Sequence, residues 1–163
     1  MTIVPSELVR QTLLRAVQIE DRNGGLYDSL AQIFEGYEEP VRAIFLEMAE
    51  EERAHGAELR KHYQSRFGTV APLTTETKEL IETPDLEDAE ALVFDSMTPE
   101  AALQIGLHAE EAARQFYLKE ISRTSDPQLR QLYRELGEFE DRHVRVLQEK
   151  LAERAQSANL NSR

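Results

Sequence analysis

Apolar residues recur at helical spacing in four long stretches of the chain. The predicted helices cover residues 6–34, 40–67, 99–121 and 127–155. Ser6, Thr98 and Asp126 are suitable N-caps, and a proline stands in the first turn of each of the last three helices. Gly68 closes the second helix. Amphipathic helices of this length predict an all-α fold.

Short connections join the first helix to the second and the third to the fourth, so each pair should form an antiparallel hairpin. The connection between the hairpins, residues 68–97, is much longer and has room for one short helix at about 86–94. A long crossover of this kind is found in ferritin-like four-helix bundles. We therefore expect a single ferritin-like domain over residues 1–163, with a frayed tail at 156–163.

Charged residues interrupt the inner, apolar faces of these helices at matching positions in the two halves of the chain. Each half carries a glutamate, a tyrosine seven residues later, and a Glu-x-x-His pair on the next helix. In the first half these residues are Glu20, Tyr27, Glu52 and His55. In the second half they are Glu110, Tyr117, Glu140 and His143. The match predicts that the chain is a duplicated helical hairpin.

The repeated acids and histidines have the chemistry of a dinuclear metal site. Residues three apart on a helix point the same way, so Glu52 and His55 can bind one ion together. Two such hairpins, packed face to face, place four carboxylates and two imidazoles in one layer, as in di-iron and di-manganese carboxylate proteins. Two divalent cations would neutralise four carboxylates whose uncompensated burial is costly. The predicted ligands are Glu20, Glu52, His55, Glu110, Glu140 and His143.

The alternative is a metal-free bundle in which these acids and histidines form internal ion pairs. One Glu-x-x-His pair carries little information in a chain this rich in glutamate, whereas two pairs in equivalent helices favour metal. Tyr27 and Tyr117 are either plain core residues or hydrogen-bond donors to the carboxylates. Other charged residues near the ligands in sequence are expected at the surface: Glu50, Glu51, His62, His108 and Glu111.

Composition narrows the possible partners and compartments. The chain has 31 Asp and Glu against 19 Lys and Arg, a net charge of −12 that disfavours nucleic acid and anionic lipid as partners. It has no cysteine, which excludes disulfides, thiolate nucleophiles and iron–sulfur clusters. It lacks an apolar run long enough for a membrane span and a signal peptide, so we expect a cytoplasmic protein. A homodimer is the expected assembly.

The ligand pattern resembles that of the rubrerythrin branch of the ferritin-like superfamily. The resemblance rests on the motifs Glu52-Arg-Ala-His55 and Glu140-Asp-Arg-His143, the glutamates Glu20 and Glu110, and the stretches "FLEMAEEERAH" and "AEEAARQFY". It implies two bound irons, with manganese or a mixed pair as alternatives, and Glu52 and Glu140 as bridging ligands. It also implies reduction of hydrogen peroxide, or oxidation of ferrous iron by oxygen or peroxide, in a response to oxidative stress.

The sequence departs from that family in two ways. Full-length rubrerythrins carry a rubredoxin module that supplies electrons, and this chain has no cysteine to build one, so a separate electron donor is expected. They also carry a glutamate one turn beyond the third-helix ligand, where this chain has Ala113; the matching position in the first helix is Asn23. These departures leave two hypotheses: a di-iron peroxidase or ferroxidase, and a non-enzymatic iron buffer, delivery protein or sensor.

Overall fold

The computed structural model describes residues 5–69 and 97–161, and within them the chain is helical. The helices are α1 (Pro5–Ile33), α2 (Glu39–Phe67), α5 (Pro99–Arg123) and α6 (Pro127–Asn161). They confirm the predicted all-α, ferritin-like bundle of two hairpins. The helix expected at 86–94, with most of the predicted crossover, lies outside the described residues. No described helix is both long and apolar enough to cross a membrane.

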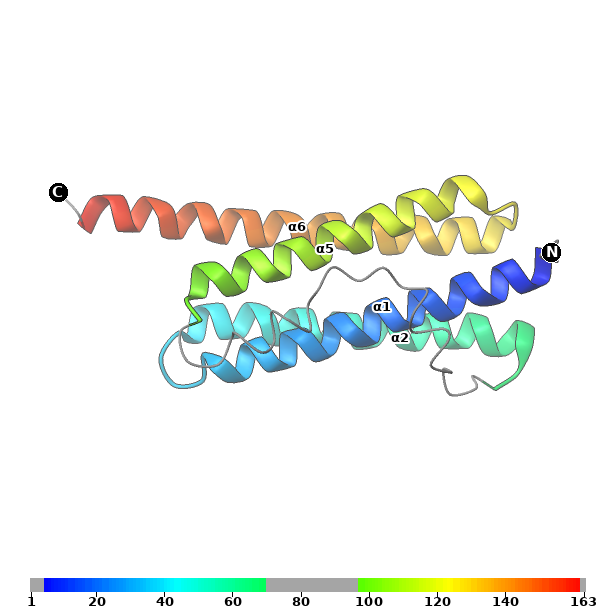
Figure 1. The fold of residues 1–163 in the computed structure, drawn as a ribbon, viewed down its shortest axis with the longest axis horizontal. Helices are drawn as coiled ribbons and strands as arrows, with labels where there is room; N and C mark the ends of the chain where they lie inside the picture. Colours follow the sequence, from blue (N-terminus) through cyan, green and yellow to red (C-terminus); the bar gives the residue numbers. More distant parts are fainter. Residues whose placement is uncertain (1–4, 70–96, 162–163) are drawn as a thin grey trace.

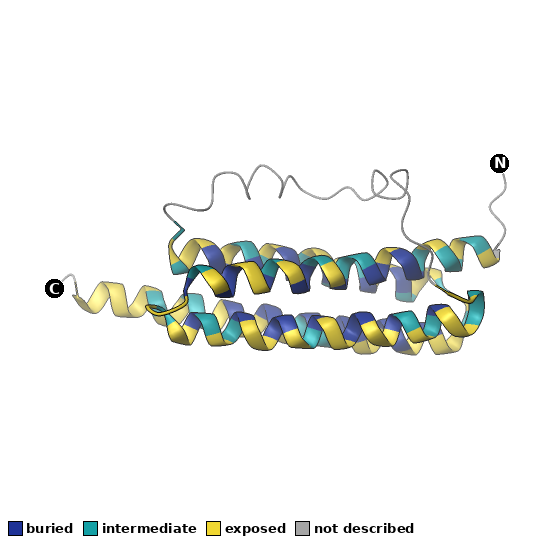
Figure 2. Ribbon diagram, turned by 90° about the horizontal axis from the view of Figure 1, so that it is seen from below, coloured by how far each residue is buried: buried dark blue, intermediate teal, exposed yellow. Residues whose placement is uncertain are grey.

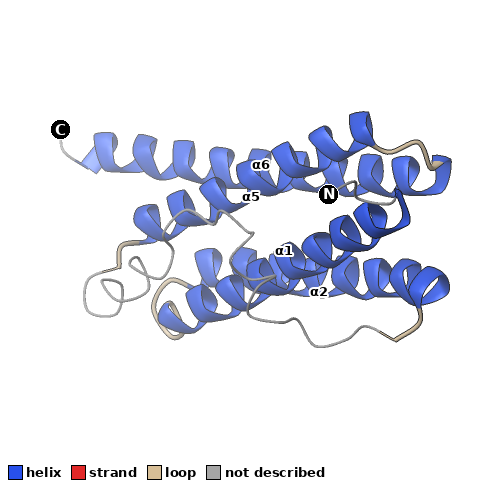
Figure 3. Cartoon of the chain, turned by 45° about the vertical axis from the view of Figure 1, so that its right-hand side comes forward, coloured by secondary structure: helices blue, strands red, loops and turns tan. Residues whose placement is uncertain are grey.

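The helices pair as the short connections predicted. α1 packs against α2 in one antiparallel hairpin and α5 against α6 in the other, and the two hairpins lie face to face (Figures 1 and 3). α2 and α5 run in the same direction, so the end of α2 and the start of α5 lie at opposite ends of the bundle (Figure 1). That placement requires a long crossover, which the sequence provides.

The helix ends follow the predicted capping chemistry with one exception. The Thr98 hydroxyl accepts a hydrogen bond from the Ala101 amide at 3.1 Å, and Asp126 Oδ1 accepts one from the Gln128 amide at 2.8 Å. Gly68 ends α2 with φ +81°, a conformation that other residues rarely adopt. Ser6 was expected to cap α1, but α1 already includes it, because proline at position 5 suits the first turn.

The fourth helix is longer than predicted and takes in most of the stretch 156–163 that was expected to fray. α6 continues through Asn161 rather than ending near residue 155. Its last turns project past the other helices and are exposed (Figure 2). No glycine or proline interrupts this stretch, and adding a residue to an existing helix avoids the cost of starting one.

Two apolar clusters form the core and enclose a polar layer. One cluster holds Leu13, Val17, Leu59, Tyr133 and Leu136 together with neighbouring residues. The other holds Leu30, Phe34, Phe45, Leu103 and Leu147 with theirs. Along every helix the predicted ligand positions fall between the residues of the two clusters, on the faces that are buried in Figure 2. The polar layer is therefore sealed by hydrophobic side chains above and below.

Candidate metal centre

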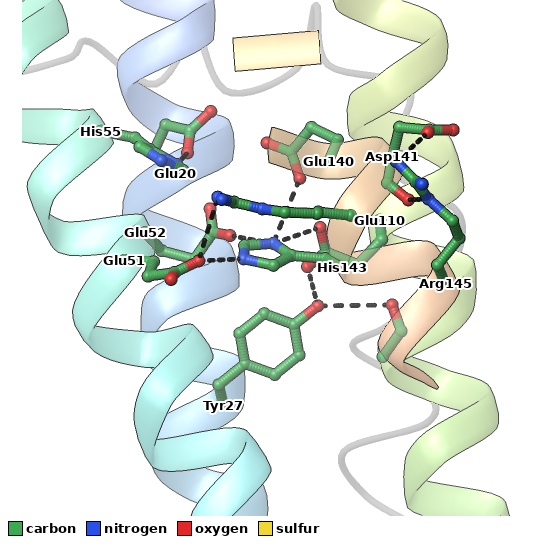
Figure 4. Close-up of polar contacts among 12 residues, drawn as sticks. Glu20, Tyr27, Glu51, Glu52, His55, Glu110, Glu140, Asp141, His143 and Arg145 are labelled. Carbon is green, nitrogen blue, oxygen red and sulfur yellow. Dashed lines mark hydrogen bonds and ion pairs between the residues drawn. The ribbon is translucent and has the colours of Figure 1, made fainter. Parts of the chain in front are cut away.

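Each helix contributes one fully buried glutamate to the polar layer. Glu20 of α1, Glu52 of α2, Glu110 of α5 and Glu140 of α6 all have 0% of their surface exposed. Their positions follow from the helical stripe, since each occupies an inward-facing site on the buried face of its helix. Figure 4 shows Glu20, Glu52, Glu110 and Glu140 converging from the four helices. The structure thus brings together the four carboxylates that the repeat predicted.

The two predicted histidines are buried beside these carboxylates. His55 Nδ1 lies 3.3 Å from Glu20 Oε2. His143 Nδ1 lies 3.0 Å from Glu110 Oε2 and 3.2 Å from Glu52 Oε1. Both rings therefore present the same nitrogen, Nδ1, to the interior of the cluster (Figure 4).

The six side chains form two overlapping groups of potential ligands. One group is Glu20, Glu52, His55 and Glu140, and the other is Glu52, Glu110, Glu140 and His143. Within each group one ligand atom per residue lies within 4.8 Å of the others. Glu52 and Glu140 belong to both groups, so two cations held by these groups would be neighbours that share two carboxylates.

Unpaired polar atoms show that the cluster fits metal ions. Six ligand-type atoms here have no hydrogen-bond partner among the described residues: Glu20 Oε2, both carboxylate oxygens of Glu52, His55 Nδ1 and both carboxylate oxygens of Glu140. Buried polar atoms are almost always paired, because an unpaired one loses its hydration without compensation. Carboxylate oxygens and imidazole nitrogens without sulfur suit iron or manganese. The donor set is thus compatible with two such ions.

The pKa shifts in the cluster express the cost of burying several carboxylates together. Burial raises the pKa of Glu52 to about 10, and repulsion from nearby carboxylates adds to it although contact with His143 opposes it. Burial likewise raises the pKa of Glu140 well above its usual range. Burial would also raise the pKa of Glu110, but its contacts with Glu140 and His143 outweigh burial and lower the value. Protons or cations must therefore compensate the cluster's charge.

The pKa of His143 follows from the same contacts. Burial acts to lower it, but close contacts with the carboxylates of Glu110, Glu140 and Glu52 outweigh burial and raise it above the ordinary value for histidine. The imidazolium thus partly compensates the carboxylates around it.

Tyr27 and Tyr117 are hydrogen-bond donors to the cluster, the second of the two roles considered for them. The hydroxyl of Tyr27 on α1 donates to Glu110 on α5, and that of Tyr117 on α5 donates to Glu20 on α1. Burial first, and then the adjacent carboxylates, raise the pKa of both phenols well above the usual value, so both stay protonated. Each hairpin thus orients a carboxylate of the other hairpin.

Tyr27 also explains a glycine on the inner face of α5. A Cβ at Gly106 would lie 3.3 Å from the Tyr27 ring, closer than most such contacts, and the Tyr27 hydroxyl is 3.3 Å from the Gly106 carbonyl oxygen. The absence of a side chain lets the phenol reach Glu110.

Glu51 was expected at the surface, where its side chain is 36% exposed, but it also contacts a predicted ligand. Its Oε2 lies 2.6 Å from His143 Nε2, on the opposite ring nitrogen from the cluster (Figure 4). Its position one residue before Glu52 turns it about 100° away from the inner stripe of α2, into the junction with α6. The available signal was the mismatch between the hairpins, because the residue matching Glu51 is the apolar Phe139.

The other residues expected at the surface do not enter the cluster. Glu50 and His108 are exposed and Glu111 is half-buried. His62 is half-buried near the end of α2, where its Nε2 lies 3.6 Å from Glu58 Oε1. Ala113 and Asn23, which stand where the resemblance implied an additional glutamate and its counterpart, are both buried. The cluster therefore has no seventh ligand of the type that those positions could have supplied.

Comparison with known proteins supports the family suggested by the ligand pattern. A family model described as Rubrerythrin matches residues 11–152. An uncharacterized conserved protein from Magnetospirillum magnetotacticum is similar in structure, with a TM-score of 0.70 and 21% identity over 88% of this chain and 93% of that one. A hypothetical protein from Pyrococcus furiosus is also similar, with a TM-score of 0.66 and 24% identity over 88% and 87% of the chains. At these identities the structures share the fold alone. No curated protein sequence matches.

Proposed function

Because the chain belongs to the rubrerythrin family, we propose that its buried cluster binds two iron ions and reduces hydrogen peroxide or oxygen. The observation that carries this proposal is the pair of overlapping ligand groups joined by Glu52 and Glu140. Two neighbouring ferrous ions would supply the two electrons that convert hydrogen peroxide to water, or oxygen to hydrogen peroxide. Manganese, or one ion of each kind, is compatible with the same ligands.

The position of each side chain determines the ligand role that we propose for it. Glu20 and Glu110 each belong to one ligand group and would be terminal ligands, whereas Glu52 and Glu140 would bridge. His55 and His143 each complete one group. Tyr27 and Tyr117 hold the terminal carboxylates by hydrogen bonds, which limits the rearrangement needed when an ion binds. The apolar clusters above and below keep bulk water from these ligands.

Electrons come, in this proposal, from a separate donor protein or from further ferrous ions in a ferroxidase cycle. The chain has no cysteine with which to build an iron–sulfur donor of its own. We further propose a cytoplasmic homodimer with neither nucleic acid nor membrane as a partner, consistent with the net charge of −12.

A second candidate, an iron buffer, delivery protein or sensor without turnover, is favoured by Ala113. The family resemblance implies an additional glutamate at that position for ligand exchange, and Ala113 is buried without a carboxylate. Turnover separates the two candidates. A buffer oxidises its bound iron once and stops, whereas an enzyme consumes peroxide for as long as a reductant is supplied.

The decisive experiment is anaerobic loading with ferrous iron, desalting and metal analysis, followed by peroxide consumption with an excess of reductant. We expect about two irons per chain, as in other di-iron carboxylate bundles, and loss of iron in His143→Ala. Sustained consumption would support the enzyme, and a single oxidation would support the buffer. A chain that retains no iron would overturn both, leaving a structural ion-pair cluster.

A further inference from the structure

The ring of His143 is held on both sides. Its Nδ1 faces the cluster carboxylates, and its Nε2 lies 2.6 Å from Glu51 Oε2. A carboxylate can only accept in such a contact, so Nε2 carries a proton and donates it. A cation at Nδ1 replaces the proton there, while the proton on Nε2 stays in the hydrogen bond with Glu51. This hydrogen bond selects the ring orientation and tautomer that present Nδ1 to a metal.

The matching side of the duplicated hairpin is built differently. The residue equivalent to Glu51 is Phe139, whose ring centroid lies 4.6 Å from that of His55 at an interplanar angle of 52°. An aromatic ring packs against the imidazole but gives its Nε2 no carboxylate acceptor. Both histidines thus direct Nδ1 at carboxylates of the cluster. The position that gives His143 a carboxylate partner for Nε2 gives His55 a phenyl ring instead.

Arg142 stabilises the contact between Glu51 and His143. Its Nη2 lies 3.9 Å from Glu51 Oε2, and its Cζ lies 4.3 Å from the centroid of the Phe139 ring. The guanidinium is therefore held by Phe139 and attracts the carboxylate of Glu51. The first hairpin has Ala54 at the position that matches Arg142, so this support also exists on one side alone.

We propose that Glu51 is a positioning residue for His143 and makes the two metal subsites unequal, so that the subsite of His143 fills first. This inference rests on the proposed dinuclear site. Hydrogen bonding to Glu51 makes Nδ1 a more basic ligand and fixes the ring before the ion arrives, whereas the residue at the matching position, Phe139, packs a phenyl ring against His55. Loss of such a partner weakens metal binding by about 10- to 100-fold.

The test is anaerobic calorimetric titration with ferrous iron alone. The unmodified chain should bind in two stages of different affinity. Glu51→Ala should weaken the tighter stage by about 10- to 100-fold. Glu51→Gln keeps an oxygen that can accept from Nε2 while removing the charge, so it should restore most of the loss. Glu50→Ala is the matched control, because Glu50 is the exposed neighbour with the same charge, and its titration should equal that of the unmodified chain.

A spectroscopic measurement separates positioning from general damage. In the zinc-loaded protein, which is diamagnetic, nitrogen NMR should show His143 with its proton on Nε2 in the unmodified chain and in Glu51→Gln. In Glu51→Ala the signals should instead show His143 exchanging between ring orientations or tautomers. Equal titrations of Glu51→Ala and the unmodified chain would overturn the inference, as would a Glu51→Gln variant as weak as Glu51→Ala. An unmodified chain that binds no metal would overturn the dinuclear site itself.

Discussion

The two hairpins supply the same ligands at the same spacing, but the surroundings of their histidines differ. Toward the interior each histidine faces the first-helix glutamate of its own hairpin, His55 facing Glu20 and His143 facing Glu110. His143 Nδ1 also lies 3.2 Å from Glu52 Oε1. Tyr27 and Tyr117 extend this match, each donating across to the other hairpin. Toward the exterior the match ends, because a carboxylate meets one ring and a phenyl group meets the other.

The difference shows where a duplicated site can change. Glu52 and Glu140 belong to both ligand groups, so altering either one alters both subsites at once. Glu51 contacts one histidine alone, and a change there leaves the other half intact. A substitution of a shared ligand therefore affects both subsites. A substitution at Glu51 or at its counterpart Phe139 can change one subsite alone. The predictions that follow test first the symmetric interior and then the asymmetric edge.

The largest effect is expected from Glu52→Ala. This change removes a ligand common to both groups, so metal content after ferrous loading should fall from about two ions per chain to nearly none. Glu20→Ala removes a ligand of one group alone and should leave about one ion. Metal analysis after desalting measures both. The exposed Glu47→Ala on the same helix serves as control and should retain the full content. Equal losses in Glu52→Ala and Glu20→Ala would contradict the sharing.

The second effect is a fall in stability with rising pH when a chelator keeps metal away. The folded pKa of Glu52 is about 10 against an ordinary 4.5, so between these values the folded state holds a proton that the unfolded state has lost. The raised pKa values of Glu140 and His143 act in the same direction. Between about pH 5 and pH 10 stability thus falls as pH rises, by about 1.4 kcal/mol per pH unit for each such proton.

Urea unfolding at pH 6 and pH 9 measures this dependence. The lowered pKa of Glu110 acts only near and below the ordinary value of 4.5, outside this interval. Glu52→Gln, which cannot lose a proton, should reduce the slope. Saturating metal should reverse it, because cations compete with protons for the same oxygens. A chelated chain as stable at pH 9 as at pH 6 would show that the carboxylates are already compensated in another way.

The third effect tests the matched tyrosines. Tyr27→Phe and Tyr117→Phe each remove one hydroxyl that donates to a buried carboxylate and leave the ring in place. Each should lower the free energy of unfolding by about 1–3 kcal/mol, and the two losses should be alike because the two hydrogen bonds have the same donor, acceptor and burial. Unfolding in urea measures both, with Tyr37→Phe as an exposed control. Clearly different losses of stability in the two variants would show that the two tyrosine–glutamate hydrogen bonds are not equivalent.

The same contrast explains what the sequence could predict. The meeting of Glu20, Glu52 and Glu140 was predictable because helical periodicity sets the inner face and the internal repeat marks the same positions twice. Glu51 was not predictable in this way. It lies about 100° from the inner stripe, and whether such a residue meets solvent or a neighbouring helix depends on how α2 and α6 rotate about their axes. The helical periodicity of the sequence does not predict that rotation.

The end of α6 was missed for another reason. The last residues were expected to fray because chain ends often do, but the balance there is local: each added residue joins a helix that is already formed and finds no breaker before Asn161. Composition alone does not reveal this, since the same residues without a preceding helix would have to nucleate one.

The smallest effect is expected from a substitution that gives His55 the same kind of outer partner as His143. Phe139→Glu places a carboxylate at the position that matches Glu51, where the duplicated geometry directs it to Nε2 of His55. If Glu51 accounts for the inequality of the subsites, this variant should narrow the gap between the two stages of ferrous titration by about tenfold. Phe139→Leu is the control, because it removes the ring without adding an acceptor and should leave the gap unchanged. A result in which the affinity difference closes in Glu51→Ala and yet stays unchanged in Phe139→Glu would mean that a carboxylate at position 139 is not enough to support His55. Arg142, which has only Ala54 as its counterpart, would then be the part of the edge that the first hairpin lacks.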